Sequence, residues 1–213
     1  MKKRLALLQM DVHVNDVEYN YNRVQELLTQ SLSESPDIIV LPETWNTGFY
    51  PSDDLITIAD RNGERTKSLL TAFAKKHKVN IVGGSVAVAK DDLVFNTSYA
   101  YNREGTLVGE YSKMHGFSPA KEDKYFASGT HTTHFELDGI PCSTVICYDI
   151  RFPELVRMAA LPGTELLFVP AQWPTSLAST KRSTSHRKPI IPLRSQRMRY
   201  YWSRSKHRSL RRL

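Results

Sequence analysis

The chain has 213 residues, of which 40% are hydrophobic and 24% are charged, with 10 glycines and 11 prolines. This composition is typical of a globular protein and excludes collagen-like, low-complexity and wholly disordered chains. No apolar run approaches the roughly 18 residues needed to cross a bilayer, and the first residues show no signal-peptide cleavage pattern. We therefore expect a soluble, cytoplasmic protein.

The net charge of +7 comes from the C-terminal part of the chain. Residues 175–213 contain 12 of the 29 Lys and Arg residues and no acid, which leaves 17 basic against 22 acidic residues in residues 1–174. We divide the chain accordingly into a mildly acidic domain, residues 1–174, and a basic, Ser- and Arg-rich tail, residues 175–213, for which we expect disorder. The charge of the domain itself does not indicate nucleic acid as a partner.

Hydrophobic periodicity predicts strands and helices in a mixed order. Strands are predicted at 4–12, 37–43, 79–88, 93–101, 106–111, 133–138, 141–147 and 165–173, and helices at 15–32, 63–77 and 152–161. Asp138-Gly139 predicts a tight turn, and Gly83-Gly84 indicates close packing or a bulge. Strands alternate with helices at both ends and form hairpins in the middle, which predicts a layered α/β protein with a mixed sheet.

Three strand-like segments run directly into a reactive polar residue: IIVLPE into Glu43, GEYSK into Lys113 and STVIC into Cys147. The carboxyl ends of strands are where open α/β sheets place their ligand sites. A carboxylate, an ammonium and a thiol gathered there suit nucleophilic acyl transfer, with Glu43 as general base and acid. Lys113 would stabilise the thiolate and the oxyanion, and the backbone N–H of Tyr148 is a second candidate oxyanion donor.

Other histidines and cysteines are weaker candidates. His115 suggests a Cys–His pair, but no Asn or Asp partner for it is evident in the sequence. Cys142 and Cys147 are five residues apart in what resembles one strand, so they would point to opposite faces and form no disulfide. Two cysteines suit a reducing compartment and cannot build a Cys-rich zinc site.

The segments around the three residues share a family pattern. LPETWNTGF (41–49), YSKMHGFSP (111–119) and ICYDIRFPEL (146–155) closely resemble, in order, the three motifs of the nitrilase, or carbon–nitrogen hydrolase, superfamily. The resemblance covers about residues 4–174, and the third motif is most similar to the ω-amidase branch. It implies a four-layer α-β-β-α sandwich that pairs as a homodimer. It also implies hydrolysis of small linear amides through a Cys thioester, with release of ammonia and without metal or organic cofactor.

The resemblance implies a role for each matching residue. Cys147 is the nucleophile, Glu43 the general base and acid, and Lys113 the electrostatic stabiliser, while Glu122 in KEDKYF matches in kind a second, positioning glutamate. Arg151 is either structural or an anchor for an acidic substrate group. Trp173 is a candidate wall of the substrate pocket, although a core or rim position is as compatible with the sequence.

The resemblance ends after VPAQWP, where Arg and Ser replace the apolar periodicity. We interpret this change as a frameshifted or truncated C-terminal part, with the last strands and a helix of the fold missing and catalysis impaired. A different class of function remains open: a non-catalytic remnant whose basic tail binds nucleic acid or acidic partners. A third possibility is an enzyme of another branch, acting on carbamoyl or nitrile substrates.

Overall fold

The computed structural model describes residues 3–172 and the backbone of residues 199–202. The strands are β1 (Leu5–Leu7), β2 (Ile38–Val40), β3 (Asp60–Arg61), β4 (Asn80–Val82), β5 (Val86–Lys90), β6 (Leu93–Tyr101), β7 (Leu107–Ser112), β8 (His134–Leu137), β9 (Ile140–Thr144), β10 (Leu166–Val169) and β11 (Arg199–Trp202). The α-helices are α1 (Val17–Ser31), α2 (Leu55–Ile58), α3 (Glu64–His77), α4 (Glu122–Tyr125) and α5 (Pro153–Ala160). Short 3₁₀ turns cover Leu32–Glu34, Ser118–Ala120 and Cys147–Arg151.

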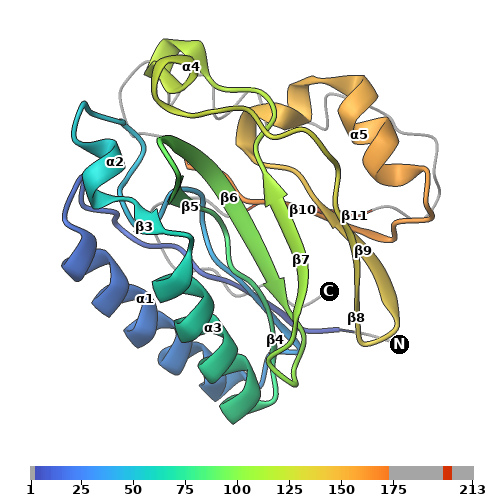
Figure 1. Cartoon of the computed structure of the whole chain (residues 1–213). Coiled ribbons are helices and arrows are strands. Elements are labelled where there is room, and N and C mark those ends of the chain that lie inside the picture. Colours follow the sequence, from blue (N-terminus) through green and yellow to red (C-terminus); the bar gives the residue numbers. More distant parts are fainter. Residues whose placement is uncertain (1–2, 173–198, 203–213) are drawn as a thin grey trace, which may run out of the picture.

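The described strands form two sheets (Figure 1). The first sheet has the order β1-β2-β4-β6-β5-β3, with β7 on the other edge of β6. Its β1, β2 and β4 are parallel, and β6 runs antiparallel to β4, β5 and β7. The second sheet has the order β11-β10-β9-β8, in which β10 is parallel to both of its neighbours. Both sheets are therefore mixed, as the combination of crossovers and hairpins in the sequence predicts.

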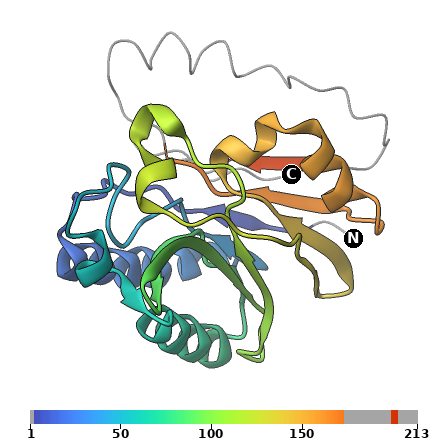
Figure 2. The ribbon, with the colours of Figure 1, turned by 45° about the horizontal axis from the view of Figure 1, so that its top comes forward.

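Alternation along the strands builds the layers. In β2, Ile39 packs in the core cluster that contains Leu28 of α1 and Leu70 of α3, whereas Ile38 and Val40 pack with Phe168 of β10. One face of the first sheet thus meets α1 and α3, and the other face meets the second sheet. Figure 2 shows these layers from the side, with α1 and α3 below the sheets and α5 above them.

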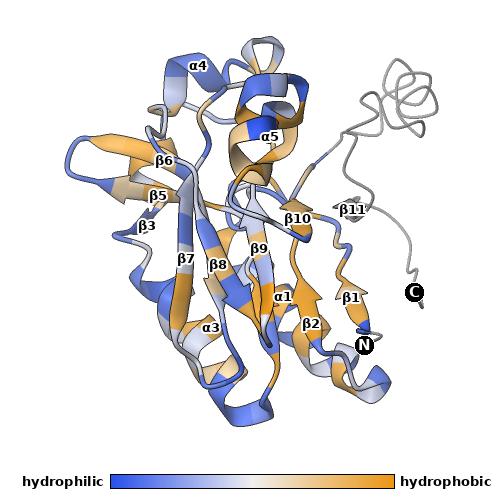
Figure 3. Ribbon diagram, turned by 90° about the vertical axis from the view of Figure 1, so that its right-hand side faces the viewer, coloured by the Kyte–Doolittle hydropathy of each residue, from blue (hydrophilic) through white to orange (hydrophobic). Residues whose placement is uncertain are grey.

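The outer face of the second sheet is covered by α5. Leu155 and Val156 of that helix pack against Leu167 and Val169 of β10, so β10 is apolar on both faces. Figure 3 shows that the residues along β1, β2 and β10 are largely hydrophobic. The order helix, sheet, sheet, helix confirms the predicted four-layer α-β-β-α sandwich.

Most predicted elements exist, with shorter bounds. Asp16 caps α1, since its carboxylate accepts a hydrogen bond from the backbone N–H of Tyr19. The predicted strand 79–88 is two strands, because the chain turns at Gly83 and Gly84 to pass from β4 to β5. A side chain would not fit there: a Cβ on Gly84 would lie 1.9 Å from the carbonyl oxygen of Pro42. The interpretation of this pair as a close-packing site is confirmed.

Four residues of the basic tail form a strand. Arg199–Trp202 pair in parallel register with Leu166–Val169, in a region where the sequence pattern predicts no element. The division of the chain at residue 174 stays a prediction, since residues 173–198 and 203–213 lie outside the described structure. Among the described helices, none has the length and apolar character that a membrane span requires.

Candidate active site

Glu43, Lys113 and Glu122 meet in a buried ionic cluster. The Lys113 Nζ lies 2.8 Å from Glu43 Oε1 and 2.7 Å from Glu122 Oε2. The side chains of Lys113, Glu43 and Glu122 are 4%, 0% and 2% exposed, respectively, so the cluster is almost fully removed from water. Cys147 completes it, because the charges of Glu43 and Lys113 both act on its thiol. The three residues of the separate motifs converge.

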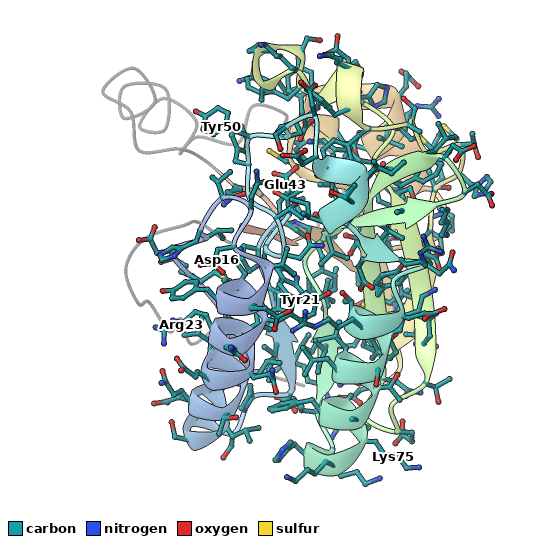
Figure 4. All side chains as sticks on the ribbon, turned by 60° about the vertical axis from the view of Figure 1, so that its left-hand side comes forward. Asp16, Tyr21, Arg23, Glu43, Tyr50 and Lys75 are labelled. Carbon is teal, nitrogen blue, oxygen red and sulfur yellow. The ribbon has the colours of Figure 1, made fainter. Side chains whose placement is uncertain are left out.

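Strand ends bring these residues together. Glu43 lies three residues after β2, Lys113 directly follows β7, and Cys147 lies three residues after β9. β2 is parallel to β4, β6 is antiparallel to β4, and β7 is antiparallel to β6, so β7 runs in the same direction as β2. Both strands therefore present their carboxyl ends at one edge of the sheet. Figure 4 shows Glu43 near this end of the molecule, beyond Tyr21 of α1, whose side chain extends toward α3.

The Glu43 carboxylate is held by three N–H donors. Oε1 accepts from Lys113 Nζ and, at 3.1 Å, from Asn96 Nδ2, and Oε2 accepts from the backbone N–H of Gln172 at 2.9 Å. These bonds fix the carboxylate while leaving acceptor capacity for the thiol. Neither Asn96 nor Gln172 is among the site residues that the sequence predicts. Asn96 could be found from the sequence, because a buried amide on the face of β6 that meets the second sheet is unusual in a largely apolar strand. Gln172 could not, because it binds Glu43 through its backbone N–H, which every residue except proline has.

The loop that carries Glu43 is fixed by backbone contacts around Gly84. The carbonyl of Pro42 accepts a hydrogen bond from the Ser85 N–H, and the Ser85 hydroxyl accepts one from the Thr44 N–H. Gly84 has φ +63°, a conformation that side chains disfavour. Its missing Cβ and its positive φ therefore let the β4–β5 connection close directly over the residue before Glu43.

Cys147 lies in a turn and not in a strand. The predicted strand extends to residue 147, but β9 ends at Thr144 and Cys147 begins a 3₁₀ turn. Its φ is +46°, in the left-handed region, and its backbone N–H donates to the Pro170 carbonyl at 2.9 Å. A residue with a side chain keeps such a conformation only where its surroundings hold it. Cys142 and Cys147 are both free, as predicted.

Burial and charge shape the proton affinities of the cluster. Burial lowers the pKa of Lys113, but the negative charges of Glu43 and Glu122, and that of the Cys147 thiolate where it forms, outweigh it and raise the pKa above its ordinary value. Burial raises the pKa of Cys147 well above its ordinary value, and the Glu43 carboxylate raises it further, against the opposing effect of Lys113. At neutral pH the cluster therefore contains an ammonium and a protonated thiol.

Glu122 is the fourth member of the cluster. Burial raises its pKa to about 6, the charge of Glu43 adds to the increase, and Lys113 opposes it. Besides the lysine, its Oε2 accepts a hydrogen bond from the backbone N–H of Phe117 at 2.6 Å. Glu122 thus ties Lys113 to the loop that follows β7, which is the position that the predicted supporting role requires.

Two of the remaining predicted residues, Tyr148 and Arg151, lie around the turn after Cys147. Tyr148 follows the thiol directly, and its ring lies 5.1 Å from that of Phe117, centroid to centroid. Arg151 is exposed, with its guanidinium 5.6 Å from the Tyr148 ring. Trp173 lies outside the described residues, as does most of the tail on which the nucleic-acid alternative depends.

His115 has a carboxylate partner that the sequence analysis did not identify. Its Nδ1 lies 2.9 Å from Asp149 Oδ1, and its ring stacks on Phe152 with the centroids 3.5 Å apart. In the described ranges 3–172 and 199–202, no group of three or more His, Cys, Asp or Glu side chains is arranged to hold a metal ion.

Comparison with known sequences gives the family. The carbon–nitrogen hydrolase family model matches residues 4–206, which extends past the point where the motif resemblance ends. The chain is 41% identical over 174 residues to the 2-oxoglutaramate amidase of Bacillus subtilis, covering 82% of this chain and 66% of that protein. It is 31% identical to the omega-amidase NIT2 of Danio rerio, covering 79% and 63%. The chain thus spans less than two thirds of the length of either relative.

Solved structures give the same assignment. Nit3 of Saccharomyces cerevisiae, described as a member of branch 10 of the nitrilase superfamily, superimposes with a TM-score of 0.72 at 27% identity, covering 82% of this chain and 66% of that one. A CN-hydrolase superfamily protein of Xanthomonas campestris gives a TM-score of 0.73 at 27% identity, with 86% and 69% covered. With a matching family model, ω-amidases among its relatives and the same fold, the chain belongs to the carbon–nitrogen hydrolase family of the nitrilase superfamily.

Proposed function

We propose that this chain hydrolyses the terminal amide of small linear substrates, as an ω-amidase does, and releases ammonia through a thioester on Cys147. The observation that carries the proposal is the buried contact of Lys113 with both Glu43 and Glu122 beside a free cysteine thiol. The substrate class is supported by the 41% identity to a protein named 2-oxoglutaramate amidase.

Acylation begins with a proton transfer. Because the pKa of Cys147 is raised, the thiol is protonated before substrate binds and needs a base. Glu43, the carboxylate whose charge acts most strongly on that thiol, takes the proton as the sulfur attacks the amide carbon. The carbonyl π electrons move to oxygen, where the Lys113 ammonium and the Tyr148 N–H stabilise the developing negative charge.

Collapse of the tetrahedral intermediate releases ammonia. Glu43 returns its proton to the amide nitrogen as the C–N bond breaks, which leaves a thioester and neutral ammonia. A water molecule then attacks the thioester carbon while Glu43 accepts one of its protons. The C–S bond breaks, the thiolate recovers the proton, and the carboxylic acid leaves, so atoms and charge balance over the cycle.

We also propose that the enzyme is a homodimer and that it is cytoplasmic. The resemblance to the nitrilase superfamily implies a homodimer, and the sequence suggests a cytoplasmic enzyme. Light scattering after size-exclusion chromatography tests the first, since the chain mass is 24.3 kDa and a dimer has twice that mass. Fractionation of cells that express the full chain tests the second.

Ammonia release from a panel of small linear amides tests the activity. The panel contains 2-oxoglutaramate, simple ω-amides, a carbamoyl compound and a nitrile, each assayed with the wild type and with Cys147→Ala. Release from the ω-amides that the substitution abolishes supports the proposal. Release only from the carbamoyl or nitrile compounds would favour another branch, and a soluble, folded wild type inactive on the whole panel would contradict enzymatic function.

A further inference from the structure

Asp149 has a fully buried carboxylate that bridges two segments of the site. Oδ2 accepts hydrogen bonds from the Tyr111 hydroxyl at 2.7 Å and from the Ile146 N–H at 3.0 Å. Oδ1 accepts from the His115 N–H at 3.0 Å and lies 2.9 Å from His115 Nδ1. Two donors thus come from the segment around Lys113, and one comes from the residue before Cys147.

On the lysine side, the bridge grips the chain on both sides of Lys113. Tyr111 is two residues before the lysine and His115 is two residues after it, and both bind the same carboxylate. The Tyr111 side chain is buried, and the His115 ring is stacked on Phe152. Neither donor can move without breaking packing, so the backbone that carries the lysine is fixed relative to Asp149.

On the cysteine side, the bridge closes the turn that holds the thiol. The Asp149 N–H donates to the Ile146 carbonyl at 3.0 Å, and the Asp149 side chain accepts from the Ile146 N–H. Cys147 lies between these two residues with its φ of +46°. The paired bonds are the local contacts that hold this unfavourable backbone conformation in place.

The donors also make the buried charge tolerable. Burial raises the pKa of Asp149, while hydrogen bonds from Tyr111, Ile146 and His115, and more weakly the charge of Lys113, oppose the rise. A buried carboxylate without such partners would be strongly disfavoured. Loss of one donor therefore weakens both the bridge and the charge that holds the other donors.

We infer that Asp149 is a positioning residue that fixes the Cys147 thiol relative to the Lys113 ammonium by tying the nucleophile turn to Tyr111 and His115. This inference rests on the proposed amidase function, and it concerns a residue whose carboxylate binds Tyr111, Ile146 and His115 rather than Glu43, Lys113 or Cys147. Its consequence is kinetic, since a displacement of about 1 Å in a reacting group costs up to about 100-fold in rate.

Two substitutions weaken the bridge to different degrees. Asp149→Asn keeps the volume but turns an NH₂ group toward donors, so at least one backbone N–H loses its acceptor. Tyr111→Phe removes only the hydroxyl and leaves the ring packed. The matched control is Tyr21→Phe, because Tyr21 is also buried and its hydroxyl also binds a carboxylate, Asp60 at 3.0 Å, but between α1 and α3.

The first readout is steady-state kinetics on the best amide of the panel. We expect Tyr111→Phe to lower kcat about 10-fold or more with KM within about 3-fold, and Asp149→Asn to lower it further. Both Tyr→Phe variants should lose a similar few degrees of Tm, but Tyr21→Phe should keep kcat within about 2-fold of the wild type. A purely structural role would make the two Tyr→Phe variants alike in kcat.

The second readout does not require amidase activity. Iodoacetamide alkylation of Cys147, followed by mass spectrometry of its peptide across pH 6–10, reports the reactivity of the thiol beside Lys113. We expect slower alkylation and a shifted pH profile in Tyr111→Phe but not in Tyr21→Phe. Alkylation and kcat of Tyr111→Phe equal to those of Tyr21→Phe would overturn the inference. A wild type that is alkylated at Cys147 but releases no ammonia would instead contradict the proposed function.

Discussion

The space between the two sheets has two contrasting regions, each with a buried cysteine. Cys142 lies among apolar side chains, with Phe135, Leu137 and Phe168 around it, and burial raises its pKa to about 12. Cys147 lies beside an ammonium and two carboxylates that are even less exposed than Cys147 itself. Both thiols are free, and burial raises the pKa of both.

The difference shows that burial alone does not make a nucleophile. In the apolar region the Cys142 thiol donates to the Ile140 carbonyl at 3.2 Å, and among the described residues no carboxylate or ammonium is bonded to it. In the polar region Glu43 can remove the thiol proton and Lys113 can stabilise the charge that results. The same layer thus stabilises the fold at one end and supports chemistry at the other.

Removing the two thiols in turn is the strongest test of this contrast. Cys147→Ala should lower kcat by about 10⁴-fold or more, since no other group in the cluster can form the thioester. Cys142→Ala should leave kcat unchanged and cost about 1 kcal/mol of unfolding free energy, through a small cavity. Ammonia release and urea denaturation measure the two effects. Equal activity losses in both variants would contradict the assignment of the nucleophile.

Replacing the buried cation tests the polar region separately. Lys113→Met removes the stabilising charge and should lower kcat about 10²- to 10³-fold. It also leaves two carboxylates in the interior without their cation, which costs about 3–5 kcal/mol. The control is Lys90→Met, whose ammonium pairs with Glu110 at the surface and should contribute less than about 1 kcal/mol. An active, fully stable Lys113→Met variant would remove the lysine from the mechanism.

The sequence predicts the site better than it predicts the network around it. Glu43, Lys113 and Cys147 lie in local motifs that can be recognised, and the helix and strand periods place each motif at the end of an element. Asn96 and the Gln172 N–H reach the site, and Asp149 reaches Tyr111, only through the pairing of segments far apart in the chain. Likewise the break at Gly84 depends on the approach of Pro42, so periodicity alone reads 79–88 as one strand.

Two glycine substitutions sharpen the comparison between the site loop and an ordinary turn. Gly84→Ala would place a Cβ 1.9 Å from the Pro42 carbonyl oxygen and displace the loop before Glu43. We expect a cost of about 3 kcal/mol and a loss of activity. Gly139→Ala also has a positive φ but meets no atom within 4 Å, so it should cost about 1 kcal/mol with full activity. A fully active Gly84→Ala variant would show that the Glu43 loop tolerates displacement.

The pH dependence of stability gives the smallest effect and isolates Glu122. Because burial, and then the charge of Glu43, raise its folded pKa from 4.5 to about 6, the folded state binds its proton more tightly than the unfolded chain does. Its contribution is therefore most favourable below pH 4.5 and is lost as the pH rises through 6, by about 2 kcal/mol in total. Glu122→Gln cannot titrate. The difference in unfolding free energy between the wild type and this variant should fall by that amount from pH 4 to pH 7 in urea titrations. A difference that stays constant with pH would mean that Glu122 remains ionised throughout, with Lys113 outweighing its burial.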